Sequence, residues 1–123
     1  PGDRVILTKP TFGEYEIACR ISGARLEIID TGEDDDFKID IERITKVIKR
    51  FKPKILFLCN PNNPTGTYLN HEDLLCILKK MTPKQFLCID EAYYNYAIAD
   101  NFPASINLYK QFQKKKNPKK DVT

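Results

Sequence analysis

Four short apolar runs alternate along this chain with longer amphipathic stretches. The runs occupy residues 4–8, 25–29, 55–59 and 86–89. Each has the length and composition of a buried strand, and the third is apolar on both faces, as strands of a covered parallel sheet are. Because strands that alternate with helices favour a parallel sheet with right-handed crossovers, we expect a three-layer α/β fold with flanking helices.

The stretches between the runs have helical periodicity and helix-end signals. Thr11 and Glu14 form a capping-box pattern at the first of them. Asp40 and Asn70 are suited to cap the next two, and Gly23 is placed to end the first. The sequence therefore predicts helices over residues 12–22, 41–52 and 71–80, with a weaker one over 104–112.

If the strands lie in the order 2-1-3-4, the winding reverses between the first and third strands. In open α/β sheets, ligands bind beyond the carboxyl ends of the strands at such a reversal. Phe12, Asn63 and Asp90 each follow or end a strand, although they are far apart in the sequence. We therefore expect these three side chains to meet at the edge of the sheet formed by the carboxyl ends of the strands, which we call the mouth.

Composition and charge limit the classes of function. The chain has 123 residues, enough for one domain, and its formal net charge is +3. Residues 114–123 contain five lysines and one aspartate, so the positive charge lies in a tail and not on a folded face. We expect a partial domain over residues 1–113 and a lysine-rich linker or tail over 114–123, with no nucleic-acid partner and no membrane partner.

The cysteines show no metal-type spacing, and the chain has one histidine. Cys59 and Cys88 lie inside apolar runs, where cysteine acts as a small hydrophobe. Reduced cysteines and the lack of a signal peptide favour a cytoplasmic location, and no metal site is predicted. Because the chain begins with Pro1 and not methionine, we expect a further portion upstream.

Polar segments follow the third and fourth runs, and they carry the chemistry. Residues 60–66 contain two Asn-Pro pairs and Thr-Gly, while the fourth run leads into Asp90, with Tyr93 three residues later. Asn, Pro and Gly are turn residues, and an acid commonly ends a strand, so each segment alone has a plain structural explanation. Together they place an amide, a carboxylate and a phenol at neighbouring strand ends, which suits the pyridine ring and phenolic oxygen of pyridoxal 5'-phosphate.

The Asn-Pro-Thr-Gly motif at residues 63–66 and the Asp-Glu-Ala-Tyr motif at 90–93 resemble those of the fold-type-I pyridoxal-phosphate aminotransferases of class I and II. The resemblance covers nearly the whole chain. It implies that Asn63 and Tyr93 contact the phenolic oxygen of the cofactor and that Asp90 pairs with the pyridine nitrogen. A carboxylate in a low-dielectric pocket holds that nitrogen protonated, so that the ring accepts electrons from the substrate.

The start of the first helix fits the same family. There, an aromatic residue after Pro-Thr stacks on the cofactor ring, which implies this role for Phe12. A core aromatic at a helix start is the plain alternative. Tyr15 is less suited to stack, because it falls on the inward face of the helix. The resemblance also implies cis peptide bonds at residues 63–64 and 9–10, a feature essentially confined to proline.

Within the family, the chain is most similar to the histidinol-phosphate aminotransferases. That branch implies amino transfer between histidinol phosphate and 2-oxoglutarate, giving imidazole acetol phosphate and glutamate, in a cytoplasmic homodimer. Threonine-phosphate decarboxylases, which are lyases, look similar here. Aminotransferase-like domains also occur without catalysis in DNA-binding regulators, so both alternatives stay open. A receiver-like domain does not explain the motif at residues 63–66.

The Schiff-base lysine of the family has no counterpart in this sequence, so no catalytic residue is assigned. The resemblance places that lysine and the anion-binding arginines after residue 123, and the glycine-rich phosphate turn before residue 1. We therefore expect the whole protein to be an enzyme, and this chain alone to be inactive and to bind the cofactor weakly. We also expect the fourth strand to form an exposed edge that pairs with another chain.

Overall fold

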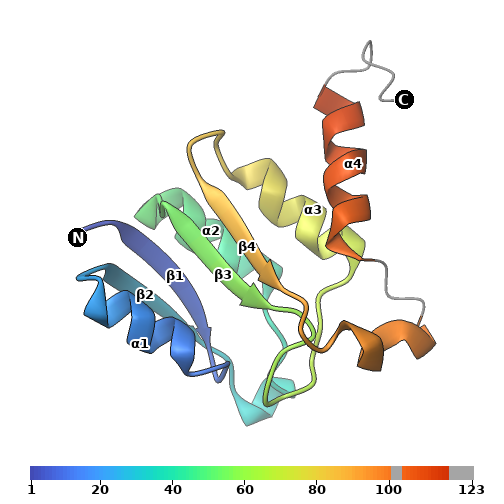
Figure 1. Cartoon of the computed structure of the whole chain (residues 1–123), viewed down its shortest axis with the longest axis horizontal. Coiled ribbons are helices and arrows are strands. Elements are labelled where there is room, and N and C mark those ends of the chain that lie inside the picture. Colours follow the sequence, from blue (N-terminus) through green and yellow to red (C-terminus); the bar gives the residue numbers. More distant parts are fainter. Residues whose placement is uncertain (101–103, 117–123) are drawn as a thin grey trace.

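The structure is a computed structural model that describes residues 1–100 and 104–116. Its centre is the expected parallel sheet, with four strands in the order β2-β1-β3-β4, the order on which the argument for one mouth depends (Figure 1). The strands are β1 Arg4–Lys9, β2 Arg25–Asp30, β3 Ile55–Cys59 and β4 Phe86–Asp90. β3 has the predicted bounds, and the other strands extend one residue further at their carboxyl ends.

Helices cover both faces of the sheet and complete three layers (Figure 1). α1 packs on one face, α2 and α3 pack on the other, and α4 lies beside β4 in contact with α3. Two short 3-10 helices, η1 and η2, follow β2 and β4. The three-layer α/β prediction is therefore confirmed. The helices are α1 Glu14–Ile21, η1 Glu33–Asp35, α2 Ile41–Phe51, α3 His71–Lys80, η2 Tyr94–Asp100 and α4 Ser105–Lys116.

The alternation of side chains along the strands divides the core between the two faces. Val5 and Leu7 of β1 face α1, where they pack with Cys19. The larger cluster lies between the sheet and the other helices. Its members are all buried: Ile6, Ile29, Ile44, Ile48, Leu56, Leu58, Leu69, Leu74, Ile77 and Leu108. Burial of this apolar surface is the main force that holds α2 and α3 on the sheet.

Two of the three predicted helix caps are present. The Asp40 carboxylate accepts hydrogen bonds from the backbone N–H groups of Glu42 and Arg43, at 2.9 and 3.1 Å. At the start of α3, the Asn70 side chain accepts from the Asp73 N–H at 2.9 Å, and the Asp73 side chain accepts from the Asn70 N–H at 3.2 Å. These contacts satisfy N–H groups that a helix start otherwise leaves unpaired.

The third predicted cap is wrong. α1 begins at Glu14 and not at residue 12, and Gly13 occupies the cap position without a side-chain hydrogen bond. The Thr11 hydroxyl instead donates to the side chain of Asn62, 51 residues away, at 2.7 Å. The Thr11 hydroxyl therefore bonds to Asn62, which the fold brings close, and not to the N–H groups at the start of α1. The other end of α1 is as predicted, because Gly23 follows it with a left-handed φ of 71°.

Cys88 is exposed, which corrects the prediction that it is a buried hydrophobe. Leu87 and Ile89 pack toward the core on the α3 side, so Phe86 and Cys88 point to the α1 side. α1 contacts β1 and β2, and Phe86 is 59% exposed on the uncovered part of that face. Cys59, in contrast, is buried as predicted.

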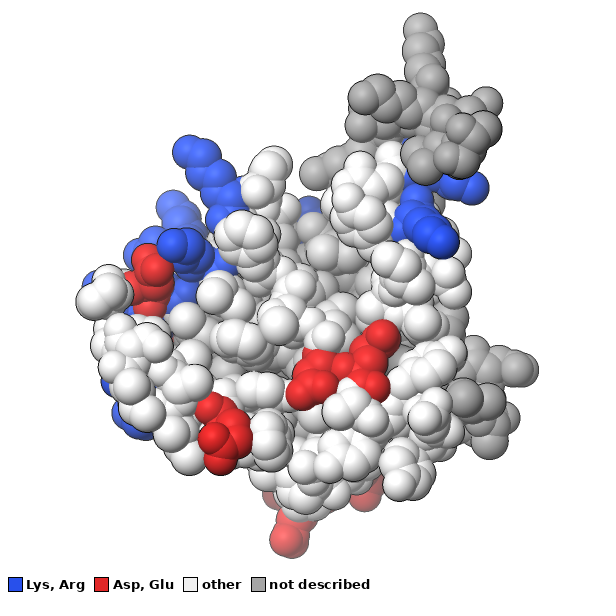
Figure 2. Space-filling view, viewed as in Figure 1, with Lys and Arg blue, Asp and Glu red and all other residues white. Residues whose placement is uncertain are grey.

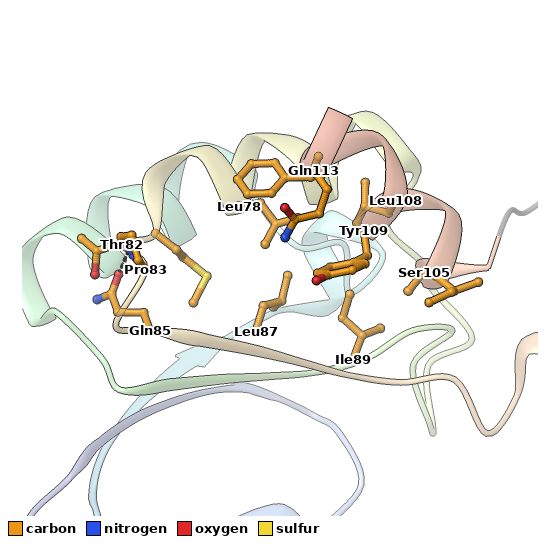
Figure 3. A pocket seen from close by; sticks show the side chains of 13 residues that line it. Leu78, Thr82, Pro83, Gln85, Leu87, Ile89, Ser105, Leu108, Tyr109 and Gln113 are labelled. Carbon is orange, nitrogen blue, oxygen red and sulfur yellow. Dashed lines mark hydrogen bonds between the residues drawn. The ribbon is translucent and has the colours of Figure 1, made fainter. Parts of the chain in front are cut away.

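α4 bounds a hollow beside β4. The hollow has a volume of about 600 Å³, with Leu87 and Ile89 of the strand and Leu108 and Tyr109 of the helix among the residues that line it (Figure 3). α4 continues to Lys116, past the predicted boundary at residue 113, so the first residues of the predicted tail are helical. Residues 117–123 of that tail lie outside the described residues.

Candidate functional site at the carboxyl ends of the strands

The carboxyl ends of β1, β3 and β4 meet at one edge of the sheet (Figure 1). Cys59 and Asp90 are direct neighbours in the β3–β4 register, and the Asn60 N–H donates to the Asp90 carbonyl at 2.8 Å. Asp90 ends β4, and the connections that leave the three strands carry Phe12, Asn63 and Tyr93. The winding reverses between β1 and β3, which is where α/β sheets bind ligands.

The loop after β3 is held from within the fold. Asn60 is 1% exposed, and its side chain exchanges two hydrogen bonds with the backbone of Leu69, at 2.7 and 3.0 Å. The peptide bonds at residues 63–64 and 9–10 are cis, as predicted, and the bond at 60–61 is also cis. The two hydrogen bonds of Asn60 tie the loop after β3 to the segment that leads into α3.

Asn63 and Tyr93 lie side by side across this mouth. The Asn63 amide donates to the Tyr93 hydroxyl at 3.4 Å, although the two residues are 30 apart in the sequence. A hollow of about 380 Å³ adjoins them, walled by the proline-rich loop and by tyrosines. The Asn63 amide and the Tyr93 hydroxyl are therefore two adjacent hydrogen-bond donors, and both could donate to the same ligand oxygen.

Asp90 is half-buried at the end of β4, and both of its carboxylate oxygens accept a hydrogen bond. The Tyr15 hydroxyl donates to Oδ2, and the backbone N–H of Ala92 donates to Oδ1 at 3.0 Å. A carboxylate oxygen has capacity for two such bonds, so each oxygen can accept one more. The two hydrogen bonds hold the Asp90 carboxylate in place, and it can still accept a hydrogen bond from a ligand.

Tyr15 is a site residue that sequence reasoning missed. Its ring stacks on Phe57 of β3, with centroids 5.5 Å apart and an interplanar angle of 9°, so it faces the sheet as expected. Burial, followed by its hydrogen bonds to Asp90 and Cys59, raises the pKa of the Tyr15 phenol well above its usual range. Tyr15 therefore stays protonated and donates to Asp90. In the sequence, only its position three residues after Phe12 indicated a place near the site, and nothing indicated that it contacts Asp90.

Phe12 is placed where it can meet a ring. It is 41% exposed, and its own ring makes an edge contact with Tyr15, with centroids 5.5 Å apart at 78°. Phe12, Tyr15 and Asp90 therefore form one continuous group, beside the pair of Asn63 and Tyr93. Asp90 and Tyr93 belong to the same short segment, so the two groups border the same mouth.

Charge is distributed unevenly between the two ends of the sheet. Basic side chains surround a hollow at the amino ends of the strands, formed in part by Lys49, Lys52, Lys54 and Lys84. In Figure 2, Lys and Arg gather toward the amino ends of the strands and α4, with some acidic atoms among them, whereas most of the Asp and Glu in view lie toward the carboxyl ends. Among the described residues no helix is long and apolar enough to cross a membrane, and no cluster of His, Cys, Asp and Glu could hold a metal ion.

The donor set at the mouth fits the ring of pyridoxal phosphate. A carboxylate suits a pyridinium N–H, paired amide and phenol donors suit a phenolic oxygen, and an exposed aromatic ring suits the ring face. The phosphate of the cofactor finds no such partner here, because none of the residues around the hollow beside Asn63 and Tyr93 is a lysine or an arginine. The described mouth therefore suits the ring half of that cofactor.

Comparison with known proteins identifies relatives. A family model for aminotransferase class I and II matches residues 1–118. A histidinol-phosphate aminotransferase of Caldanaerobacter subterraneus subsp. tengcongensis is 38% identical over 95 residues, which cover 77% of this chain and 26% of that protein. The crystal structure of the Sinorhizobium meliloti histidinol-phosphate aminotransferase in complex with pyridoxal-5'-phosphate matches with a TM-score of 0.66 at 24% identity, over 75% of this chain and 24% of that one. A decarboxylase from Sulfurospirillum multivorans matches with a TM-score of 0.62 at 29% identity, over 72% and 22%.

The fold and the mouth define an α/β protein whose parallel sheet presents an amide, a carboxylate and aromatic side chains at the carboxyl ends of its strands. The chain belongs to the aminotransferase class I and II family, whose model covers nearly all of it. Eight curated relatives, 32–38% identical, are all histidinol-phosphate aminotransferases. The chain spans between 26% and 31% of the length of these relatives.

Proposed function

We propose that the whole protein is a pyridoxal-phosphate-dependent aminotransferase that moves an amino group from histidinol phosphate to 2-oxoglutarate. The observation that carries this proposal is the contact between Asn63 and Tyr93, at the mouth that also holds Asp90. The named activity of the curated relatives supports the choice of substrate. On the same likeness we propose a homodimer that works in the cytoplasm. This chain would supply the part of the site that holds the cofactor ring.

Asn63 and Tyr93 would hold the phenolic oxygen of the cofactor. One amide N–H of Asn63 is directed at the Tyr93 hydroxyl oxygen, so the second amide N–H and the Tyr93 O–H can both donate to a ligand. Two donors that are already oriented stabilise an oxyanion without reorganisation when it forms. Their mutual contact keeps them at one point of the mouth.

Asp90 would accept the N–H of the pyridine ring, and Tyr15 would orient it. Bound pyridoxal phosphate supplies an electron sink for the α-carbon of the amino substrate. Tyr15 and the Ala92 N–H each hold one oxygen of the Asp90 carboxylate, which leaves acceptor positions directed to the mouth. A negative charge held there favours the protonated form of the ring nitrogen. Phe12 would lie on the ring face.

The substitution Asp90→Asn in the whole protein tests this assignment. It keeps the size of the side chain and removes the charge, so we expect the rate of glutamate formation from histidinol phosphate and 2-oxoglutarate to fall at least about a hundredfold. Glu91→Gln is the matched control. It removes one carboxylate from the next residue, whose side chain instead accepts from Ser105 at 2.8 and 2.5 Å. Near-normal turnover of Asp90→Asn would refute the role of Asp90.

The chain itself tests whether one of its lysines binds the cofactor covalently. No lysine lines the hollow beside Asn63 and Tyr93. We therefore expect that pyridoxal phosphate and borohydride reduction leave no single stoichiometric adduct in the intact mass of the 123-residue chain. A stoichiometric adduct that maps to one lysine would show that the chain carries its own covalent residue.

A decarboxylase is the second candidate, because a decarboxylase is among the structures that share this fold at 29% identity. The two activities differ in their products. Given histidinol phosphate and 2-oxoglutarate, the whole protein should form glutamate if it is the aminotransferase, and in a separate assay with threonine phosphate alone it should release no carbon dioxide. Release of carbon dioxide without formation of glutamate would favour the lyase, and neither product would favour a non-catalytic domain of a regulator.

A further inference from the structure

Asn62 is a buried amide whose side chain joins two loops of the mouth. It is 8% exposed. Its Oδ1 accepts from the Thr11 hydroxyl at 2.7 Å, and its Nδ2 donates to the Pro10 carbonyl at 2.9 Å and to the Thr65 hydroxyl at 2.8 Å. Two of these three contacts reach the segment after β1, more than 50 residues away in the sequence.

The residues on either side of these contacts are the proposed ligands of the cofactor. Phe12 follows Thr11 directly, and Asn63 follows Asn62 directly. Phe12 would meet the face of the pyridine ring, whereas Asn63 would meet the oxygen on its edge. Because the ring is rigid, face and edge contacts form together only if the two loops keep a fixed separation.

We propose that Asn62 is a positioning residue that sets the distance between Phe12 and Asn63 and so determines how the cofactor ring is held. This inference rests on the proposed function. Asn62 has no direct contact with the cofactor in this proposal. It acts through Pro10 and Thr11 on one side and through its own neighbour, Asn63, on the other.

A purely local role for Asn62 does not account for these contacts. The turn that contains Asn62 is already closed by backbone bonds, from the Asn62 N–H to the Thr67 carbonyl and from the Gly66 N–H to the Asn62 carbonyl, both at 2.8 Å. The turn therefore needs no side chain from outside. The bonds to Pro10 and Thr11 are additional, and they satisfy a buried amide that would otherwise be costly.

Asn60 provides a matched control within the same loop. It is the same residue type, it is 1% exposed, and its side chain also makes buried hydrogen bonds. Both of those bonds go to Leu69, ahead of α3, and not to the segment that carries Phe12. Replacing Asn60 should therefore lower stability without changing the separation of Phe12 and Asn63.

The experiment uses a fluorescent reporter at Phe12. The chain has no tryptophan, so Phe12→Trp introduces a single tryptophan at an exposed position of the mouth. The probe is pyridoxine 5'-phosphate, which has the ring and the phenolic oxygen but lacks the aldehyde that reacts with lysines. Titration with this probe gives an affinity from the quenching of tryptophan, and urea unfolding of each variant gives its stability.

In the Phe12→Trp background, Asn62→Asp should weaken binding about tenfold, because its carboxylate cannot donate to the Pro10 carbonyl. Acidification should restore part of the lost affinity, since the protonated acid can donate. Thr11→Val removes one inter-loop bond and should also weaken binding, while Thr11→Ser keeps the hydroxyl and the affinity. Thr11→Val serves as the test if Asn62→Asp does not fold.

Asn60→Asp should reduce the free energy of unfolding but change the affinity less than about twofold. Unchanged affinity in folded Asn62→Asp and Thr11→Val, with saturable quenching in the parent, would overturn the positioning role and leave the proposed function intact. Equal weakening by Asn60→Asp and Asn62→Asp would show a merely structural role and overturn it as well. Because this chain alone is expected to bind weakly, a parent without saturable quenching moves the comparison to the pyridoxal-phosphate affinity of the whole protein. There, unchanged affinity in Asn62→Asp and Thr11→Val would overturn the positioning role.

Discussion

The hydrogen bond from Tyr15 to Asp90 should stabilise the fold, and Tyr15→Phe measures how much. The substitution removes only the hydroxyl, and phenylalanine keeps the ring that stacks on Phe57 at 5.5 Å. A hydrogen bond to a charged group contributes about 1.5–3 kcal/mol. Since Tyr15 and Asp90 are only half-buried, solvent weakens the interaction, and we expect a loss of about 1–2 kcal/mol in the free energy of unfolding.

The pH dependence of this loss has a definite sign. Burial first, and then the hydrogen bonds to Asp90 and Cys59, raise the pKa of Tyr15 in the folded state above that of the unfolded chain. The folded state therefore binds this proton more tightly, and the contribution is complete below the unfolded pKa of about 10. Above that pH, the difference in stability between the parent and Tyr15→Phe should shrink, by at most about 1.4 kcal/mol per pH unit for one proton.

Urea unfolding at pH 7, 9, 10 and 11, followed by circular dichroism, provides the measurement. Tyr93→Phe is the matched control, because its hydroxyl is 3.4 Å from Asn63 and the residue is 40% exposed. We expect that control to change stability by less than about 0.5 kcal/mol. The interpretation of Tyr15 would be refuted by a Tyr15→Phe variant as stable as the parent at pH 7, or by a difference that stays constant through pH 11.

Three further predictions concern the fold. Asn70→Ala should lower the free energy of unfolding by about 1 kcal/mol, because it removes the cap of α3, and an unchanged urea midpoint would contradict this. A thiol reagent should label Cys76 first and Cys88 more slowly, since partial desolvation by neighbouring groups and the charge of Asp90 raise the pKa of the Cys88 thiol although the residue is exposed. Cys19 and Cys59 should react only after unfolding. The edge strand β4 should cause self-association that increases with concentration in sedimentation experiments, and a monomer at all concentrations would argue against an exposed edge.

Local signals predicted the elements well because short-range physics decides them. The apolar runs gave the four strands, and Asp40 and Asn70 cap α2 and α3 with the side chains that the pattern indicated. In each case the interacting groups lie within a few residues of one another. The order of the strands did not follow from such signals, because the strict handedness of crossovers does not decide which strands are neighbours.

The failures share a different cause. Thr11 was expected to cap α1, but its hydroxyl bonds to Asn62, and Cys88 was expected to be buried, but it lies on an uncovered face of the sheet. Tyr15 was considered only as a ring, because nothing near it in the sequence indicates that it contacts Asp90. Thr11 and Tyr15 each bond to a residue from a distant part of the chain, whereas Cys88 is exposed because no helix covers that part of the sheet.

The sequence by itself determined the α/β class, the positions of the strands and the residue types that can hold a pyridine ring. Only the tertiary structure decided that Tyr15 donates to Asp90 and that Asn62 joins the loops of Phe12 and Asn63. The physical reason is that periodicity and capping act over a few residues, whereas a hydrogen bond between buried groups forms wherever the packed sheet brings a donor and an acceptor together.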